Sequence, residues 1–155
     1  MIRTYQRDDK QSVLDLVRAT KNFSDDEVAI AEELIDICVD QPDQKDYYAY
    51  VNILDGRVAG FLLLGPTPAT TGTYDMYWIA VHPDFQGQGI AQALDTFAVA
   101  FVRERNGYLI IAETSSQPSY ERTRGFYTKQ DYQLMSRIPD YYKPGDDLMV
   151  FGKRV

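Results

Sequence analysis

The residues best suited to chemistry form a short glycine-containing segment, Gln86-Gly87-Gln88-Gly89-Ile90-Ala91, between a predicted strand and a predicted helix. The strand, residues 74–81, is rich in aromatic and β-branched side chains. The helix, residues 89–106, has apolar residues at helical spacing, and Gly107 suits a left-handed cap. The first turn of a helix carries N–H groups without internal partners, and glycine lets a ligand approach them closely. The segment therefore predicts a phosphate or pyrophosphate site.

Two other glycine motifs fit this segment less well. A P-loop would have Lys-Ser or Lys-Thr after the glycines, and neither dipeptide follows Gly89. A dinucleotide fingerprint tolerates Ala91 in place of its third glycine, but the surrounding order of elements is not βαβ. A nucleotide-binding protein is therefore the weaker hypothesis. A turn that uses glycine for geometry alone is the plain alternative.

The spacing around the glycines resembles a known family. Gln86-x-x-Gly89-x-Ala91 follows Val81 by five residues and resembles the pyrophosphate loop, Gln/Arg-x-x-Gly-x-Gly/Ala, of the GNAT superfamily of N-acetyltransferases. The resemblance runs from about Tyr47 to the end of the chain and is strongest over 74–132. It implies acetyl-CoA as cosubstrate, with the backbone of residues 86–91 at the pyrophosphate and that of Ile79, Ala80 and Val81 along the pantetheine arm.

A second segment supplies a candidate general acid. The run from Phe126 to Tyr132 resembles the family segment Leu-Tyr-Glu-Lys-x-Gly-Phe, and Tyr127 holds the place of the tyrosine near the cofactor sulfur. A phenol with pKa ~10 can protonate a thiolate as it forms. The alternative is one more packed tyrosine among twelve. Two departures stand out: Asp131 replaces the usual glycine, and Tyr120 replaces a cofactor-contacting Asn, a contact that residues 115–117 could supply instead.

Asp75 is the candidate base. Strand alternation predicts that Asp75, Tyr77 and Ile79 share one face with Val81. Several GNAT enzymes carry a glutamate base at the place matching Asp75, and the shorter Asp would act through a water. The alternative is a structural hydrogen bond to the preceding threonine-rich loop. Glu113, at the end of the next predicted strand, is a second acidic candidate without a supporting motif.

Aminolysis of a thioester needs a neutral amine, a polarised carbonyl and a proton for the thiolate, but no enzyme nucleophile. Cys38 lies at helical spacing with apolar residues and is predicted to be a packing residue, and His82, beside Pro83 at the end of a strand, a surface loop residue. One cysteine and one histidine exclude an internal disulfide and suggest no metal site. A single cysteine also agrees with a reducing cytoplasm.

Length, composition and charge limit the class of protein and the kinds of partner. The 155 residues predict one domain, 1–155, and 45% apolar content with mixed charges is typical of a soluble globular protein. No apolar run reaches the length of a membrane span, and the N-terminus lacks the apolar core of a signal peptide. The net charge of −7 disfavours nucleic acid. Nine acids and one base fall in residues 24–46, which indicates either a solvated helix face or a field that attracts cations.

The chain order predicts an α/β (α+β) fold. The resemblance implies the GNAT acyltransferase fold, which has a mixed, mostly antiparallel sheet and about four flanking helices. In that fold, the strand ending at Val81 and the strand beginning at Tyr108 form a parallel pair that splays apart. A capping box at Ser24 and Glu27 opens one helix, and Asp55-Gly56 is a hairpin signal. The predicted strands are 2–7, 47–54, 58–64, 74–81, 108–112, 132–138 and 147–153, and the last predicted helix is 118–129.

These features predict an N-acetyltransferase that moves an acetyl group from acetyl-CoA to a primary amine by direct attack in a ternary complex. The alternative is a non-catalytic acyl-CoA-binding module or sensor with the same fold. The acceptor, a small molecule or a peptide, is open, and we expect residues 24–46 and the loop 139–147 to wall its site. No nucleic acid or membrane partner is expected, and a homodimer would be ordinary for the family.

Overall fold

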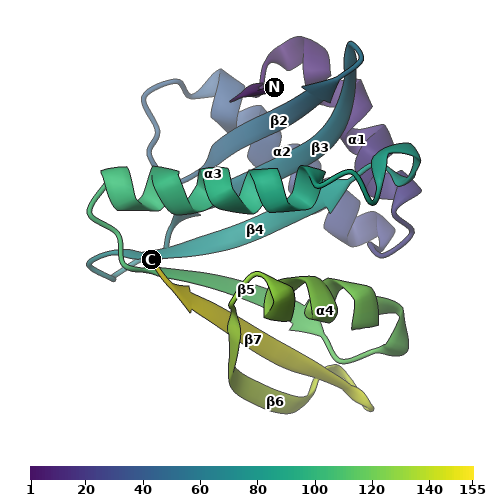
Figure 1. Ribbon diagram of the computed structural model, residues 1–155, viewed down its shortest axis with the longest axis vertical. Coiled ribbons are helices and arrows are strands. Elements are labelled where there is room, and N and C mark those ends of the chain that lie inside the picture. Colours follow the sequence, from purple (N-terminus) through teal and green to yellow (C-terminus); the bar gives the residue numbers. More distant parts are fainter.

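A computed structural model describes all residues, 1–155, and places seven strands in one sheet (Figure 1). The strand order is β1-β2-β3-β4-β5-β7-β6, and β4 and β5 are the parallel pair in an otherwise antiparallel sheet. The strands are β1 (Ile2–Thr4), β2 (Tyr48–Leu54), β3 (Arg57–Pro66), β4 (Thr73–Val81), β5 (Leu109–Ser115), β6 (Gln133–Lys143) and β7 (Asp146–Arg154).

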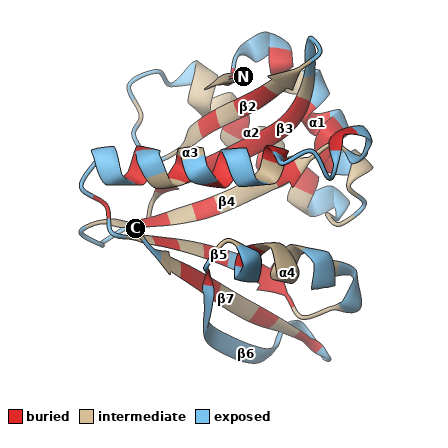
Figure 2. Ribbon diagram, viewed as in Figure 1, coloured by how far each residue is buried: buried red, intermediate tan, exposed pale blue.

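Four α-helices cover the two faces of the sheet. Helices α1 (Lys10–Ala19) and α2 (Asp25–Asp40) lie on one face, and α3 (Ile90–Glu104) and α4 (Glu121–Lys129) lie on the other (Figure 1). Each face has its own hydrophobic core, and the buried residues follow the sheet between the helices (Figure 2). The predicted order of elements and the mixed sheet are confirmed. None of the helices combines the length and hydrophobicity that crossing a lipid bilayer requires.

Local sequence signals explain several element ends. The Ser24 hydroxyl accepts from the Glu27 N–H at 3.2 Å and the Glu27 carboxylate accepts from the Ser24 N–H at 2.7 Å, so the predicted capping box opens α2. Asp55 and Gly56 both have positive φ, at 50° and 72°, which makes the tight turn between β2 and β3.

The cap of α3 differs from the prediction. Asn106, with φ 58°, adopts the left-handed conformation that was expected of Gly107. Asn tolerates this region because its short side chain is only mildly strained there. Gly107 is required by close packing instead, because a Cβ at that position would lie 2.4 Å from Cγ1 of Val102.

The two ends of the chain also differ from the prediction. The expected loop 139–147 belongs mostly to the β6–β7 hairpin, which turns at Gly145 with φ 81°. All of β6 is exposed, so it lacks the alternation of buried and exposed residues that reveals a strand in sequence. At the N-terminus, β1 ends at Thr4 and a 3-10 turn, η1 (Arg7–Asp9), precedes α1.

The parallel pair splays as the resemblance implied. Strands β4 and β5 pair only over residues 73–75 and 109–111, and β4 then continues to Val81 alongside β3 alone. Beyond Asp75, the edge of β4 that faces β5 therefore has no strand partner. This opening positions the candidate site.

A β-bulge in β4 changes which side chains share a face. Leu64 pairs with Met76 and Leu63 pairs with Trp78, so Tyr77 is an extra residue that breaks the alternation. Ile79 and Val81 pack on the α3 side, whereas Tyr77 packs on the α1 side. Asp75 lies on the Tyr77 side because its neighbours Tyr74 and Met76 belong to the core on the α3 side. The prediction that Asp75 and Tyr77 share a face with Val81 is wrong.

Candidate functional site

The glycine segment forms an open loop at the start of α3. A 3-10 turn, η2 (Pro83–Phe85), follows β4, and α3 begins at Ile90. Gly87 and Gly89 have φ of 77° and 76°, and a Cβ on either would meet no atom within 4 Å. The N–H groups of residues 87–91 donate to no backbone carbonyl. Free donors at the N-terminus of a 15-residue helix make a site for an anion.

A cleft of about 610 Å³ runs from this loop to the place where β4 and β5 diverge. Tyr77 and Trp78 line it from the α1 side of the sheet, and Ile79 and Val81 line it from the α3 side. The cleft therefore reaches both faces. It is lined by eight of the predicted cofactor residues, and Gln88 is the exception: Ile79, Ala80, Val81, Gln86, Gly87, Gly89, Ile90 and Ala91.

Tyr127, on α4, lines the same cleft. Its ring stacks on Phe151 at 5.6 Å between centroids and meets the edge of Tyr132 at 5.2 Å. The residue is only 5% exposed. Burial raises the pKa of the Tyr127 phenol above its ordinary value of 10, and the charge of Asp95 raises it further. A phenol is protonated at neutral pH at its ordinary pKa, so Tyr127 carries a proton that it could donate, and the raised pKa makes it a weaker acid.

The two candidate acids share the other face of the sheet. Asp75 pairs with Ile111 in register, and Glu113 is two residues further along β5. Burial raises the pKa of both carboxyls, and the charge of Asp75 raises that of Glu113 further. Glu113 lines the cleft, whereas Asp75 does not and accepts a hydrogen bond from the Thr67 hydroxyl at 2.9 Å. The bond to the threonine-rich loop named as the alternative is thus present.

Of the cleft residues that the sequence did not mark, three carry polar groups described here: Thr114, Trp78 and Arg122. Thr114 is 4% exposed and its hydroxyl has no partner, and the indole N–H of Trp78 is likewise enclosed and unpartnered. Both groups are enclosed by protein, so neither is open to a ligand in the cleft. Arg122 on α4 donates to Oε1 of Gln86 at 2.6 Å and brings a positive charge to the loop. No local pattern marks these residues, because only the packing of α4 against the splay brings them together.

Residues 115–117 do not line the cleft. Their side chains instead tie the end of β5 to the β6–β7 hairpin, at Gly145, Asp146 and Asp147. Tyr120 does line the cleft, and its hydroxyl donates to the backbone carbonyl of Asn22 in the α1–α2 loop. Tyr120 thus links the two sides of the cleft.

His82 and Cys38 have structural roles, in line with their predicted positions. Nδ1 of His82 accepts from the Asp84 N–H at 3.1 Å and caps η2. Cys38, on α2, is partly buried against the core on that face, and burial raises the pKa of its thiol to about 11. A thiol with that pKa is a poor nucleophile at neutral pH.

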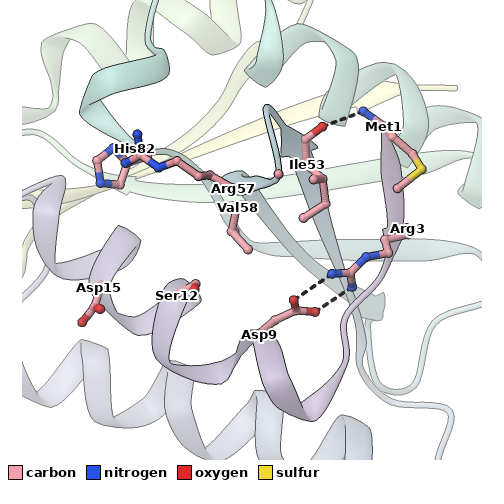
Figure 3. Close-up of a pocket in the computed structure, with 10 residues that line it drawn as sticks. Met1, Arg3, Asp9, Ser12, Asp15, Ile53, Arg57, Val58 and His82 are labelled. Carbon is pink, nitrogen blue, oxygen red and sulfur yellow. Dashed lines mark hydrogen bonds and ion pairs between the residues drawn. The ribbon is translucent and has the colours of Figure 1, made fainter.

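A second hollow, of about 440 Å³, lies beside the N-terminus (Figure 3). Its charged side chains are already paired: both guanidinium amines of Arg3 donate to the Asp9 carboxylate, at 2.7 and 2.8 Å, and Arg57 pairs with Asp84 at 3.1 Å. The hollow therefore presents little free charge to a ligand, and the cleft at the splay is the candidate site.

A glycine loop at a helix N-terminus, opening on a splayed parallel pair, defines an acyltransferase of the type that the sequence resembles. The sequence profile of the Acetyltransferase (GNAT) family matches residues 11–132, and the chain belongs to this family. The family uses acetyl-CoA as cosubstrate. A search of curated protein sequences finds no match.

Solved structures agree with this assignment. A protein from Desulfovibrio desulfuricans, crystallised as a member of the GNAT family, is 34% identical with a TM-score of 0.95, covering 99% of this chain and 98% of its own. An aminoglycoside 6'-N-acetyltransferase in complex with coenzyme A is 18% identical (TM-score 0.78, 99% and 96% covered). The ribosomal-protein-S18-alanine N-acetyltransferase from Escherichia coli is 16% identical (TM-score 0.77, 100% and 93% covered). The last two show a shared fold.

The residues of the cleft fit acetyl-CoA. The open glycine loop offers backbone donors to a pyrophosphate, and Arg122 adds a cation beside it. The unpaired edge of β4 offers backbone groups to an amide-bearing arm.

Proposed function

We propose that the protein is an N-acetyltransferase that moves the acetyl group of acetyl-CoA to a primary amine by direct attack in a ternary complex. One observation carries the proposal: the glycine loop and Tyr127, which are distant in sequence, line one cleft that passes through the splayed sheet. The cosubstrate binds on the α3 side, and the amine enters from the α1 side. The two reactants therefore meet between β4 and β5.

The loop and β4 hold the cosubstrate. The N–H groups of residues 86–91 bind the pyrophosphate, with Gln88 contributing its backbone only. The backbone of Ile79, Ala80 and Val81 is paired with β3 on one edge, so its other edge is open to the pantetheine amides. This arrangement sets the thioester near Tyr127.

Tyr127 supplies the proton for the leaving group. The amine nitrogen forms a bond to the acetyl carbon, and the carbon–sulfur bond breaks with its electron pair on sulfur. The Tyr127 hydroxyl gives its proton to that sulfur, and the phenolate recovers a proton from solvent. The products are an acetamide and the free thiol of coenzyme A, and the nitrogen releases one proton to a base.

The carboxylates of the α1 side receive the amine and its proton. Glu113 lines the cleft and Asp75 lies behind it, so we assign the base to this pair, with Asp75 acting through a water. A raised carboxyl pKa makes a better base near neutral pH. Neither carboxylate has a cationic partner in the protein, which leaves both available to an ammonium group.

The test combines calorimetry with acetyl-CoA and a thiol-release assay over a panel of amines: 1,4-diaminobutane, lysine methyl ester, an aminoglycoside and a peptide with an N-terminal alanine. We expect acetyl-CoA binding and amine-dependent release of thiol, with the acetylated amine seen by mass spectrometry. Binding without release for every amine would favour a non-catalytic acyl-CoA-binding module. Absence of binding would refute the function itself.

A further inference from the structure

A buried carboxylate on α3 is not used by the steps above. Asp95 is 1% exposed and lies beside core residues of the same helix, such as Leu94. Burying an unpaired carboxylate is strongly unfavourable, so a residue like this needs partners. Both oxygens have one: Oδ1 accepts from the Tyr132 hydroxyl at 2.7 Å, and Oδ2 accepts from the Lys153 ammonium at 2.8 Å.

Tyr132 connects this carboxylate to the proposed acid. Its ring is 3% exposed and packs edge-on against Tyr127, and its backbone N–H donates to the Tyr127 carbonyl at 3.0 Å. Asp131 makes the intervening turn with φ 64°, the left-handed conformation for which the family uses glycine. Since Asp95 holds the Tyr132 hydroxyl, the position of the Tyr127 ring depends on a residue of α3.

The charges around the cluster are balanced. Lys153 from β7 neutralises Asp95 and lies 5.3 Å from the centroid of the Tyr132 ring. Burial raises the pKa of Tyr127, and the charge of Asp95 raises it further, which favours the protonated phenol. The pair joins α3 to β7, and Phe151 on the same strand stacks on Tyr127. Two rings thus pack on Tyr127: Phe151 shares β7 with Lys153, and Tyr132 is held by its hydrogen bond to Asp95.

We propose that Asp95 is a positioning residue for proton delivery by Tyr127 and acts through Tyr132. This inference rests on the proposed acetyl transfer. Helix α3 begins at Ile90, directly after the phosphate-binding loop, and Asp95 follows in its second turn. Helix α3 therefore positions the cosubstrate through the loop at its N-terminus and positions Tyr127 through Asp95 and Tyr132. In this arrangement the Tyr127 hydroxyl faces the thioester sulfur. Loss of this link lowers kcat and leaves acetyl-CoA binding intact.

Tyr132→Phe is the first test, because it removes one hydroxyl from the link and little volume. Thiol release is measured with acetyl-CoA and the fastest amine of the panel above. We expect kcat to fall about tenfold, with the KM for acetyl-CoA within about twofold of the wild-type value. In a Tyr127→Phe background the same substitution has no further effect on kcat, because the proton it positions is already absent.

Tyr50→Phe is the matched control. Tyr50 packs on Phe97 of the same helix, at 4.5 Å between ring centroids, but does not line the cleft. Removal of the Tyr50 hydroxyl should leave kcat unchanged. Asp95→Asn keeps an oxygen acceptor for Tyr132 and should retain most of kcat, whereas Asp95→Leu should lose as much as Tyr132→Phe.

The outcomes separate the two proposals. If Tyr132→Phe lowers kcat by the same factor in both backgrounds, or leaves it at the wild-type level while Tyr127→Phe loses activity, the positioning role is refuted and the acetyl transfer stands. If no amine releases thiol, or if Tyr127→Phe keeps the wild-type kcat, the acid assignment is refuted and the positioning role with it.

Discussion

The two sides of the β4–β5 opening carry groups of opposite charge preference. On the α3 side, the loop around Gly87 and Gly89 offers backbone N–H groups, and the buried Asp95 there is neutralised by Lys153. On the α1 side, Asp75 and Glu113 are carboxylates with raised pKa values and no cationic partner. One side therefore suits an anion and the other an ammonium group.

This contrast teaches how one cleft accommodates both charges. The open N–H groups of the glycine loop lie on the α3 side of the sheet, and the two carboxylates lie on the α1 side. Backbone donors stay when side chains change, whereas carboxylates are lost by single substitutions. Changes on the α1 side should therefore alter turnover and acceptor preference, while acetyl-CoA binding depends on the α3 side. The four predictions below test this division.

The largest effect is expected at Gly89. Gly89→Glu places a side chain at φ 76° and an acid where the pyrophosphate binds, so acetyl-CoA affinity should fall by more than about 10²-fold in calorimetry. Gly56→Glu is the matched control, because Gly56 has φ 72°, equally open surroundings and a place in the β2–β3 turn. Equal affinity in wild type and Gly89→Glu would remove the loop from the site.

Tyr127→Phe should affect the chemical step alone. Since the substitution removes the proton donor and little volume, kcat should drop on the order of 10²-fold while acetyl-CoA affinity stays unchanged. Steady-state kinetics with a true amine substrate and calorimetry measure the two quantities. A wild-type kcat would make Tyr127 a packing residue of the Phe151 and Tyr132 cluster.

Glu113→Gln and Asp75→Asn should affect the acceptor side alone. Each removes a carboxylate that attracts the ammonium group and accepts its proton, so kcat/KM for the amine should fall about tenfold or more. The loss should be greatest at low pH and shrink as pH rises, because free amine then accumulates without a base. A uniform loss at every pH would indicate a structural role, and a larger loss for Glu113→Gln would identify the residue that lines the cleft as the base.

The smallest effect is one of stability. Burial raises the pKa of Asp75 above its unfolded value, so the folded protein holds that proton more tightly. The resulting stability is present below the unfolded pKa and is lost as pH rises through the folded pKa. Asp75→Asn should therefore raise Tm at pH 7 by about 1–2 °C and give no gain near pH 3.5. Calorimetric melts at both pH values check this, and a lower Tm at pH 7 would show that the ionised carboxylate is stabilising.

Most elements and the position of the glycine loop at the start of α3 could be predicted from sequence because local interactions decide them. Helix α2 begins at a capping box of residues three apart, the β2–β3 turn needs Asp-Gly, and α3 follows from helical spacing of its apolar residues. The glycine loop is contiguous, and its chemistry comes from backbone N–H groups that any helix N-terminus exposes.

The tertiary structure decided what depends on register and on distant partners. The bulge at Tyr77 arises where β4 pairs with β3, and it moves Asp75 off the face of Val81. The Asp95–Lys153 pair joins residues 58 positions apart, and no local pattern distinguishes a buried Asp on an apolar helix face from an exposed one. Side-chain placement across a sheet is set by packing of several elements at once, and a single sequence read in order does not contain that information.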